Sequence, residues 1–399
     1  MSARRLGTFV LVASVVAVVT ATAMPFRVPN PDIAQDCVTC GRGVADVFNN
    51  LLLFAPIGIG LALLDWRTPR AVLALLAFSI VLESAQLVIP GRHASVADVM
   101  LNGLGGASAF FVTPRLHVLL VLRARLASRL AVAAALLAAV LSAAPAWLFA
   151  PDYLPGGYFG MWTAKRKTLE TYQGRVIDVH VGDRAIGSRR IEATDTVRAL
   201  LAAGAPVRVR VILGPAPPGL APVFGIVNDA NDEQLLIAID ETDLVFRPRT
   251  RAVALGLGTP DFRSRGVLAD AEPGDTASVT VWREAGGICL DVDTRRVCGM
   301  RVSLASGWSA LIGGHTWPWA ANGVATLLWA VCLTLPVGYL LRRRRESLVA
   351  VALLVGGIAL AIGVAGVVAG GWDLTGLALG LMVGRGLHRL VRHRAPDRP

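Results

Sequence analysis

Residues 90–106 read PGRHASVADVMLNGLGG, and they follow an apolar run that contains Glu83 and Gln86. The two segments place ionisable and amide side chains within, or directly beside, parts of the chain that are apolar enough to lie in a membrane. A charge at that depth costs roughly 2.5–3.5 kcal/mol on insertion scales, so it is retained mainly where it is paired and used. The sequence therefore predicts a polar site inside a membrane protein. Its first candidate residues are Glu83, Gln86, Arg92, Asp98 and Asn102.

The composition also indicates a membrane protein. Of the 399 residues, 54% are hydrophobic and 17% are charged, against about 25% charged in an average soluble protein. The net charge of +11 does not indicate nucleic-acid binding. The arginines lie in short segments between apolar runs, and no basic module with interleaved aromatic residues accompanies them.

Eight apolar runs are candidates for spanning helices, each of which needs about 20 apolar residues. The first run could instead be a signal peptide cleaved at Ala21-Thr22-Ala23, but the rest of the chain is also apolar and we expect the helix to remain. The runs cover residues 6–26, 47–64, 71–89, 99–112, 130–149, 319–341, 348–370 and 374–387.

The positions of the arginines predict the orientation of these spans. If Met1 is cytoplasmic, every arginine cluster between spans falls on the cytoplasmic side, as the positive-inside rule requires. Residues 151–315 then lie outside the cytoplasm, between the fifth and sixth spans. The segments placed inside contain Arg67 and Arg70, residues 115–129, residues 342–345 and the tail from 385 onward.

Residues 160–312 have more Gly, Pro, Asp and Thr and shorter apolar stretches than their flanks. The stretches VRVRV at 207–211 and ASVTVW at 277–282 alternate, and QLLIAID at 234–240 is typical of a buried strand. Many short strands with turns between them predict a β-sandwich or barrel. We therefore predict a mixed fold with a helical membrane domain at 1–150, an inserted all-β domain at 151–315, and a helical membrane region with a basic tail at 316–399.

The cysteines predict one disulfide by register. A two-residue loop at Asp293-Thr294 pairs 292 with 295 and 291 with 296, and hence Cys289 with Cys298, on the side where disulfides persist. Cys37 and Cys40 form a CxxC motif, for which a local disulfide is favoured over redox chemistry because no thioredoxin-like pattern surrounds it. Zinc would need two further ligands, and none stands out nearby.

Near the N-terminus, a series of polar and small residues also has a characteristic order. The series comprises Asp46, Asn49 and Asn50, LFAPIG at 53–58, ESAQ at 83–86, Arg92, and then Asp98, Asn102 and Gly105. In order and spacing it resembles the VanZ-like family, over roughly residues 5–150. The resemblance implies an integral protein of the bacterial cytoplasmic membrane, and it implies a link to teicoplanin-type glycopeptide resistance through the founding member. It adds Asp46 and Asn50 to the polar site.

The outer region resembles a concanavalin A-like jelly roll of the laminin G type, on FGIVNDA at 224–230, the strand at 235–239 and GDTASVTVW at 274–282. Such domains often bind glycans or proteins, in some cases through calcium. Asn228, Asp229 and Asp232 could supply oxygen ligands for calcium. An acidic turn between two strands is the alternative interpretation, since turns favour Asn and Asp. No other cofactor is expected.

The last spans could be a degenerate second copy of the first. LPVG at 335–338, the arginines at 342–345, and Asp373 with Gly376 and Gly380 echo residues 55–58, 67–70 and 98–105. Chance recurrence in glycine-rich helices is the alternative. If the repeat is real, the two halves would pack around one site, as repeats do in transporters.

Three functions remain open from the residues. The first is a membrane protein that binds or handles an envelope lipid, a lipid-linked envelope precursor or a glycan, with Arg92 meeting phosphate. The second is a membrane enzyme acting on a lipid-linked substrate, although no known catalytic motif is present. The third is an adhesion or sensing protein that recognises glycan through the β region. We favour the first, because a Glu, two Asp and an Arg cost more than helix packing alone returns.

Overall fold

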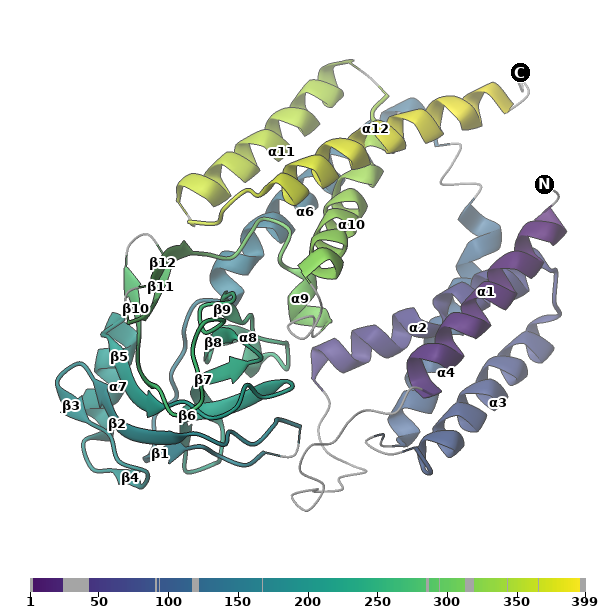
Figure 1. Cartoon of the computed structure of the whole chain (residues 1–399). Coiled ribbons are helices and arrows are strands. Elements are labelled where there is room, and N and C mark those ends of the chain that lie inside the picture. Colours follow the sequence, from purple (N-terminus) through teal and green to yellow (C-terminus); the bar gives the residue numbers. More distant parts are fainter. Residues whose placement is uncertain are drawn as a thin grey trace.

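The computed structural model describes residues 3–23, 43–89, 92, 94–116, 122–166, 168–284, 287–293, 295–312, 319–342, 344–364 and 366–394. Within these residues the chain forms an N-terminal unit of helices, a β domain and a C-terminal unit of helices (Figure 1). Seven helices are long and apolar enough to span a membrane, which is consistent with a multi-pass membrane protein. The eighth predicted span is not among the seven.

The N-terminal unit consists of four helices that follow the first four apolar runs. They are α1 (Ala3–Ala23), α2 (Val44–Leu63), α3 (Thr68–Gln86) and α4 (Val96–Val112), with the 3-10 turn η2 (Thr113–Arg115) after the last. Phe54, Leu61 and Leu75 are buried at its centre. Helices α2 and α4 approach closely, because a Cβ atom on Gly105 would lie 2.0 Å from the carbonyl oxygen of Leu51. Small residues allow such close contact between membrane helices.

The C-terminal unit consists of the helix before the β domain and three helices after it. They are α6 (Ala124–Leu148), α10 (Trp319–Leu340), α11 (Arg344–Gly363) and α12 (Gly371–Arg394). Although α6 precedes the β domain in the sequence, it packs on α10 and α11, with Ala131 and Ala135 buried against Val337 and Leu354. Helix α12 is long enough to span a membrane, but its second half carries several basic residues, which lower its hydropathy.

The β domain is a sandwich of two antiparallel six-stranded sheets, as the alternating stretches predict. The first sheet has the order β4 (Arg190–Ile191), β1 (Tyr158–Trp162), β6 (Leu220–Asn228), β7 (Glu233–Asp240), β8 (Asp243–Pro248), β9 (Phe262–Ser264). The second has the order β12 (Arg295–Met300), β11 (Gly287–Val292), β10 (Thr276–Glu284), β5 (Val207–Ile212), β2 (Arg175–Val181), β3 (Arg184–Ala185). The short helices are α7 (Thr194–Ala203), α8 (Arg251–Ala254) and α9 (Trp308–Leu311).

The two sheets differ in how their outer faces are covered. Every residue of β6 is buried, with Ala221, Val223 and Phe224 in the sandwich core and Leu220 in a second apolar cluster with Leu236, Val245 and Leu169. In contrast, β5 and β10 alternate between buried and exposed residues. The second sheet therefore presents a polar outer face, as the period-two pattern predicts.

The predicted disulfide between Cys289 and Cys298 is confirmed, with their Cα atoms 4.0 Å apart. The predicted register is also correct near the turn, where Val292 pairs with Arg295 and Asp291 with Arg296. The pairing shifts by one residue between Ile288 and Leu290, where a bulge interrupts the ladder. Cys37, Cys40 and Thr294 lie outside the described residues.

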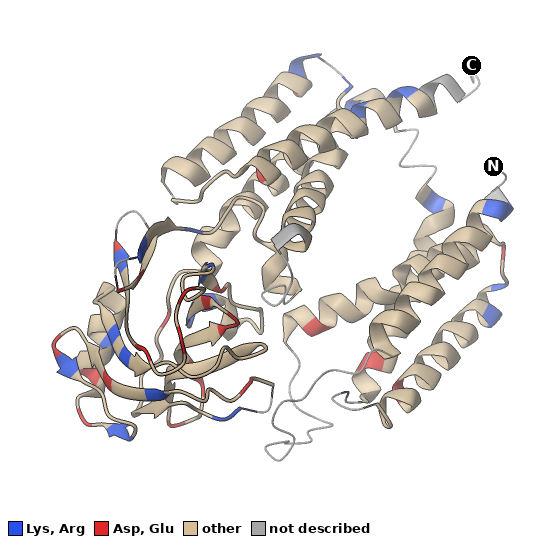
Figure 2. Ribbon diagram, in the orientation of Figure 1, with Lys and Arg blue, Asp and Glu red and all other residues tan. Residues whose placement is uncertain are grey.

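The β domain lies at one end of both helical units. Helix α2 begins against it, with the backbone N–H of Ala45 donating to the carbonyl oxygen of Gly256 at 3.3 Å. In the C-terminal unit, Ser303 bridges to Val368 between α11 and α12. Apart from Arg92, the described Lys and Arg residues of the helical units gather at the opposite ends of the helices (Figure 2). The long helices therefore have their arginine-rich ends on the side away from the β domain.

Candidate polar site in the N-terminal unit

Glu83 and Ser95 join α3 to the beginning of α4. The Glu83 side chain, only 7% exposed, lies in the last turn of α3. Its Oε2 atom accepts a hydrogen bond of 2.8 Å from the backbone N–H of Ser95, the N-cap of α4. The Ser95 hydroxyl in turn accepts from the N–H of Ala97 at 3.2 Å. A carboxylate at this position is favoured by the positive end of the helix dipole.

Asp98 and Asn50 join α4 to α2. Asp98 lies in the first turn of α4 and is buried. Its Oδ1 atom accepts a hydrogen bond of 2.6 Å from the side-chain amide of Asn50, one and a half turns into α2. Two carboxylates from different helices, Glu83 and Asp98, therefore lie at the N-terminus of α4.

Two further predicted residues are buried in the same unit. The Asn102 amide donates to the hydroxyl of Ser79 at 3.1 Å, and both side chains are buried. The Oδ1 atom of Asn102 is also buried and has no hydrogen-bond partner among the described residues. Gln86, the last residue of α3, is also buried, three residues after Glu83. The polar site thus extends one turn deeper along α4.

Arg92 and Asp46 lie at the edge of this group. Arg92, in the connection between α3 and α4, donates to the carbonyl oxygen of Ala21 near the end of α1. Asp46 is exposed in the first turn of α2. The direct pairing of Arg92 with Glu83 stays a prediction, and His93 lies outside the described residues. The structure thus brings α1, α2, α3 and α4 together around one group of polar side chains.

The polar site is connected to the segment that leaves the β domain. Asn49, next to Asn50, donates from its side-chain amide to the carbonyl oxygen of Leu311 in α9 at 2.8 Å. Consecutive asparagines of α2 therefore contact the β-domain exit and the site carboxylate Asp98. Each of the two amides therefore has its own hydrogen-bond partner.

Ser79 and Ser95 are site residues that the sequence interpretation missed. Ser95-Val-Ala-Asp98 has the spacing of a capping box, which would have placed the helix start at Ser95. Ser79 lies four residues before Glu83, on the same face of α3. Asn49 appeared only as part of the family-like series. Its contact with Leu311, 262 positions away, had no local signal.

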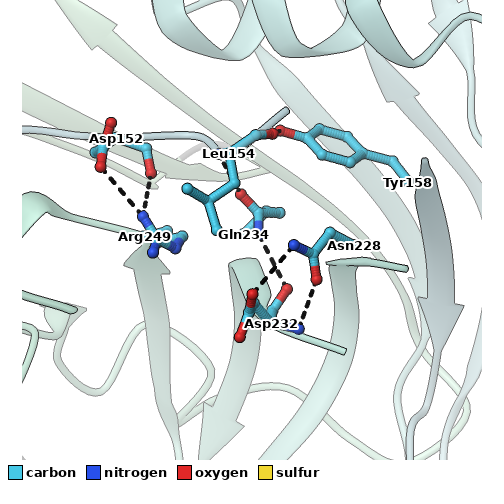
Figure 3. Close-up of polar contacts among 7 residues, drawn as sticks. All are labelled: Asp152, Leu154, Tyr158, Asn228, Asp232, Gln234 and Arg249. Carbon is cyan, nitrogen blue, oxygen red and sulfur yellow. Dashed lines mark hydrogen bonds and ion pairs between the residues drawn. The ribbon is translucent and has the colours of Figure 1, made fainter. Parts of the chain in front are cut away.

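The calcium candidates form a turn that is closed by their own hydrogen bonds (Figure 3). The Asn228 amide donates to Asp232 Oδ2 at 3.1 Å, and the backbone N–H of Asp232 donates to Asn228 Oδ1 at 2.7 Å. Asp229 accepts from the N–H of Gly157 at 3.3 Å. These bonds support the interpretation as an acidic turn, and calcium binding there stays a prediction.

Around this turn, a buried polar network holds the chain that enters the β domain from α6 (Figure 3). Gln234 accepts from the N–H of Leu154 at 2.9 Å and donates to the carbonyl oxygen of Asp232 at 3.0 Å. Arg249 donates to Asp152, and the Tyr158 hydroxyl donates to the carbonyl oxygen of Leu154. Burial raises the pKa of Tyr158 to about 12, so it remains a neutral donor. The network is a structural anchor between the sandwich and the membrane region.

Residues 5–123 match the family model described as VanZ/LLP1. The matched range covers α2, α3 and α4, all but the first two residues of α1, and every residue of the polar site. No curated protein and no solved structure matches the chain. The match suggests a membrane protein with a link to glycopeptide resistance, and it does not extend into the β domain.

Proposed function

We propose that the N-terminal unit binds the polar head of a cell-envelope lipid, most specifically a lipid-linked envelope precursor, at the site formed by Glu83, Asp98 and Asn50. The observation that carries this proposal is the buried carboxylate of Glu83 bound to the N-cap of a neighbouring helix, with a second carboxylate in the first turn of that helix. Ionisable groups in membrane segments are functional candidates by default, because burying them is expensive.

The chemistry of the site suits an amphiphile with a phosphate and a hydrogen-bonding head. Arg92 supplies a guanidinium group, which binds phosphate oxygens with a fixed pair of donors. The two carboxylates can accept bonds from hydroxyl or amine groups or hold a divalent ion. The amide of Asn50 holds Asp98 in place.

The proposed orientation places this head-group site and the β domain outside the cytoplasm. All spans have their arginine-rich end away from the β domain, and such ends are cytoplasmic under the positive-inside rule. Reporter fusions at positions 230 and 399 test the orientation. A reporter active only in the cytoplasm should be silent at 230 and active at 399, and the reverse pattern would reject the proposed side.

The binding proposal is tested by identifying lipids that co-purify with the full chain from native membranes. Mass spectrometry should find an envelope lipid enriched with the protein and depleted in the variant Glu83→Gln. Asp373→Asn is a matched control, because Asp373 is also a buried carboxylate near a helix N-terminus but lies in the C-terminal unit. Equal lipid content in all three proteins would contradict the proposed site.

A second candidate, glycan recognition by the β domain, has one observation in its favour. On the second sheet the guanidinium of Arg296 lies 5.1 Å from the ring centre of Trp282, whose Nε1 atom donates to Glu284. An aromatic ring with flanking charged groups can contact a sugar face and its hydroxyl groups. Loss of binding to isolated cell-wall material in Trp282→Ala, with Glu83→Gln unaffected, would favour this candidate over the first.

A further inference from the structure

An apolar groove runs along the outer half of α10, the half nearest the β domain. It has a volume of about 640 Å³, and its wall includes Val324, Leu328, Trp329 and Cys332 of α10 and Ile312 at the end of α9. The α10 residues recur at three- and four-residue intervals, so one continuous face of the helix forms the wall. The opposite face, which includes Ala330 and Val337, is buried against the rest of the C-terminal unit.

The length of the groove corresponds to one leaflet of a bilayer. The wall residues on α10 run from Ala321 to Cys332, which at 1.5 Å per residue is roughly 16 Å, or about half of a hydrocarbon core of about 30 Å. Because α10 begins beside the β domain, this half belongs to the leaflet that also contains the ends of α3 and α4. The groove and the polar site therefore lie at the same side of the membrane.

Helix α9 separates the groove from the polar site and contacts both. Ile312 lines the groove, and the preceding carbonyl group, that of Leu311, accepts the hydrogen bond from Asn49. The next residue of α2, Asn50, binds Asp98. The wall of the groove at Ile312 is thus connected to Asp98 through the hydrogen bond from Asn49 to Leu311 and that from Asn50 to Asp98.

We propose that this groove receives a hydrocarbon chain of the same lipid whose head group occupies the polar site, so that the ligand is a long-chain amphiphile bound across α9. This inference rests on the proposed function for the head group. The groove adds a binding place for the hydrocarbon chain of that lipid, which a soluble glycan or a free phosphate lacks. Its almost wholly apolar wall matches a chain made only of carbon and hydrogen.

The test uses the full chain in phosphatidylcholine nanodiscs, with a polyprenyl phosphate as probe and inorganic phosphate as the chain-free comparison. Cys332 lines the groove and is exposed, so its alkylation by a maleimide, followed by peptide mass spectrometry, reports occupancy. Polyprenyl phosphate should slow the alkylation several-fold, whereas inorganic phosphate should not. An unchanged rate while polyprenyl phosphate is bound would overturn the groove assignment.

A variant that fills the groove gives a second, independent measurement. Leu328→Trp should weaken binding of polyprenyl phosphate by about tenfold or more, because the displaced methylene groups lose their burial. Leu360→Trp, at an exposed position on α11 outside the groove, should bind as the unmodified chain does. If Leu328→Trp folds poorly, Val324→Phe fills the same space with a smaller ring.

The same binding assay separates the two proposals. Binding lost in Glu83→Gln but retained in Leu328→Trp would overturn the groove and support the head-group site. Binding lost in Leu328→Trp but retained in Glu83→Gln would support the groove and overturn the head-group site. Failure of the unmodified chain to bind polyprenyl phosphate would overturn both for this class of lipid.

Discussion

The two helical units use the same packing device but bury different chemistry. In each unit a proline-containing helix packs closely on a later, glycine-rich helix: α2 with α4, and α10 with α12. A Cβ atom would lie 2.0 Å from a backbone oxygen at Gly105 and 2.3 Å from one at Gly384. Each later helix also has an aspartate, Asp98 or Asp373, in its first turn.

The units differ in how the helix between these two in the sequence packs, which is α3 in the N-terminal unit and α11 in the C-terminal unit. In the N-terminal unit α3 packs on α4 and brings Glu83 to its N-cap. In the C-terminal unit α11 packs on α6, and the Asp373 carboxylate instead accepts from the N–H of Ala305, on the chain leaving the β domain, at 2.7 Å. One unit therefore uses its buried acid to anchor the β domain, and the other collects two acids at one helix end.

This comparison shows that close helix packing does not require the polar groups of the N-terminal unit. Helices α10 and α12 pack as closely as α2 and α4. Helix α11, however, has no equivalent of Glu83 or Gln86 at the corresponding positions. Polar side chains that packing does not need, and that are expensive to bury, are expected to be retained for binding. Residues 55–58 and 335–338, which are similar in sequence, lie in α2 and α10, the corresponding helices of the two pairs.

The largest expected effect on stability comes from replacing a glycine at the helix contacts with a large side chain. Gly105→Leu and Gly384→Leu should each destabilise the protein by about 3 kcal/mol or more, because the new side chain meets backbone that cannot move aside. The yield of folded protein in detergent should fall sharply for both. Gly386→Leu, where nothing lies within 4 Å, is the control. A strong loss in only one unit would show that the two packings are not equivalent.

Removing the buried acids should have a smaller effect on stability, and only one of the two changes should affect lipid binding. Glu83→Leu and Asp373→Leu each leave a buried backbone N–H without its acceptor, at a cost of about 1–3 kcal/mol. Thermal unfolding of the purified variants should show comparable losses. Lipid co-purification should be lost only in Glu83→Leu, and its loss in Asp373→Leu as well would remove the functional distinction between the units.

Removing the disulfide should affect the β domain alone. The double variant Cys289→Ser with Cys298→Ser should lower the stability of the sandwich by about 1–3 kcal/mol, since the closed loop is short and the hairpin also has ladder hydrogen bonds. Near-ultraviolet circular dichroism would follow the β domain, and lipid content would follow the N-terminal unit. A parallel loss of lipid would indicate that the helical units depend on the sandwich.

The smallest effects are expected for single polar pairs between helices. A double-mutant cycle of Asn50→Ala and Asp98→Ala should give a coupling of about 0.6 kcal/mol, the average for such pairs in membranes. Thr334→Ala provides the comparison in the C-terminal unit, where the Thr334 hydroxyl donates to the carbonyl oxygen of Leu377 at 2.8 Å. A coupling near zero for Asn50 and Asp98 would contradict the hydrogen bond between them.

Much of the architecture could be predicted from local pattern. The apolar runs predicted every long helix, and most helix ends lie within a few residues of the ends of the runs. Length and hydropathy are properties of the segment itself, so they can be read locally. Alternation predicted the strands at 207–211 and 277–282, and the turn at Asp293 predicted the partner of Cys289. The bulge between Ile288 and Leu290 was not predicted, because an inserted residue depends on how the two strands twist together.

The sequence alone was sufficient for the residue types of the polar site, since an ionisable group in an apolar run is visible without coordinates. The partners were decided by tertiary contact: Glu83 binds a backbone N–H of α4, Asn49 reaches α9, and α6 joins the C-terminal unit. Hydropathy depends on one segment at a time, whereas a hydrogen bond between helices depends on their rotation and depth. These are set by close contacts such as that of Gly105 with Leu51, distant in the sequence but adjacent in the folded chain.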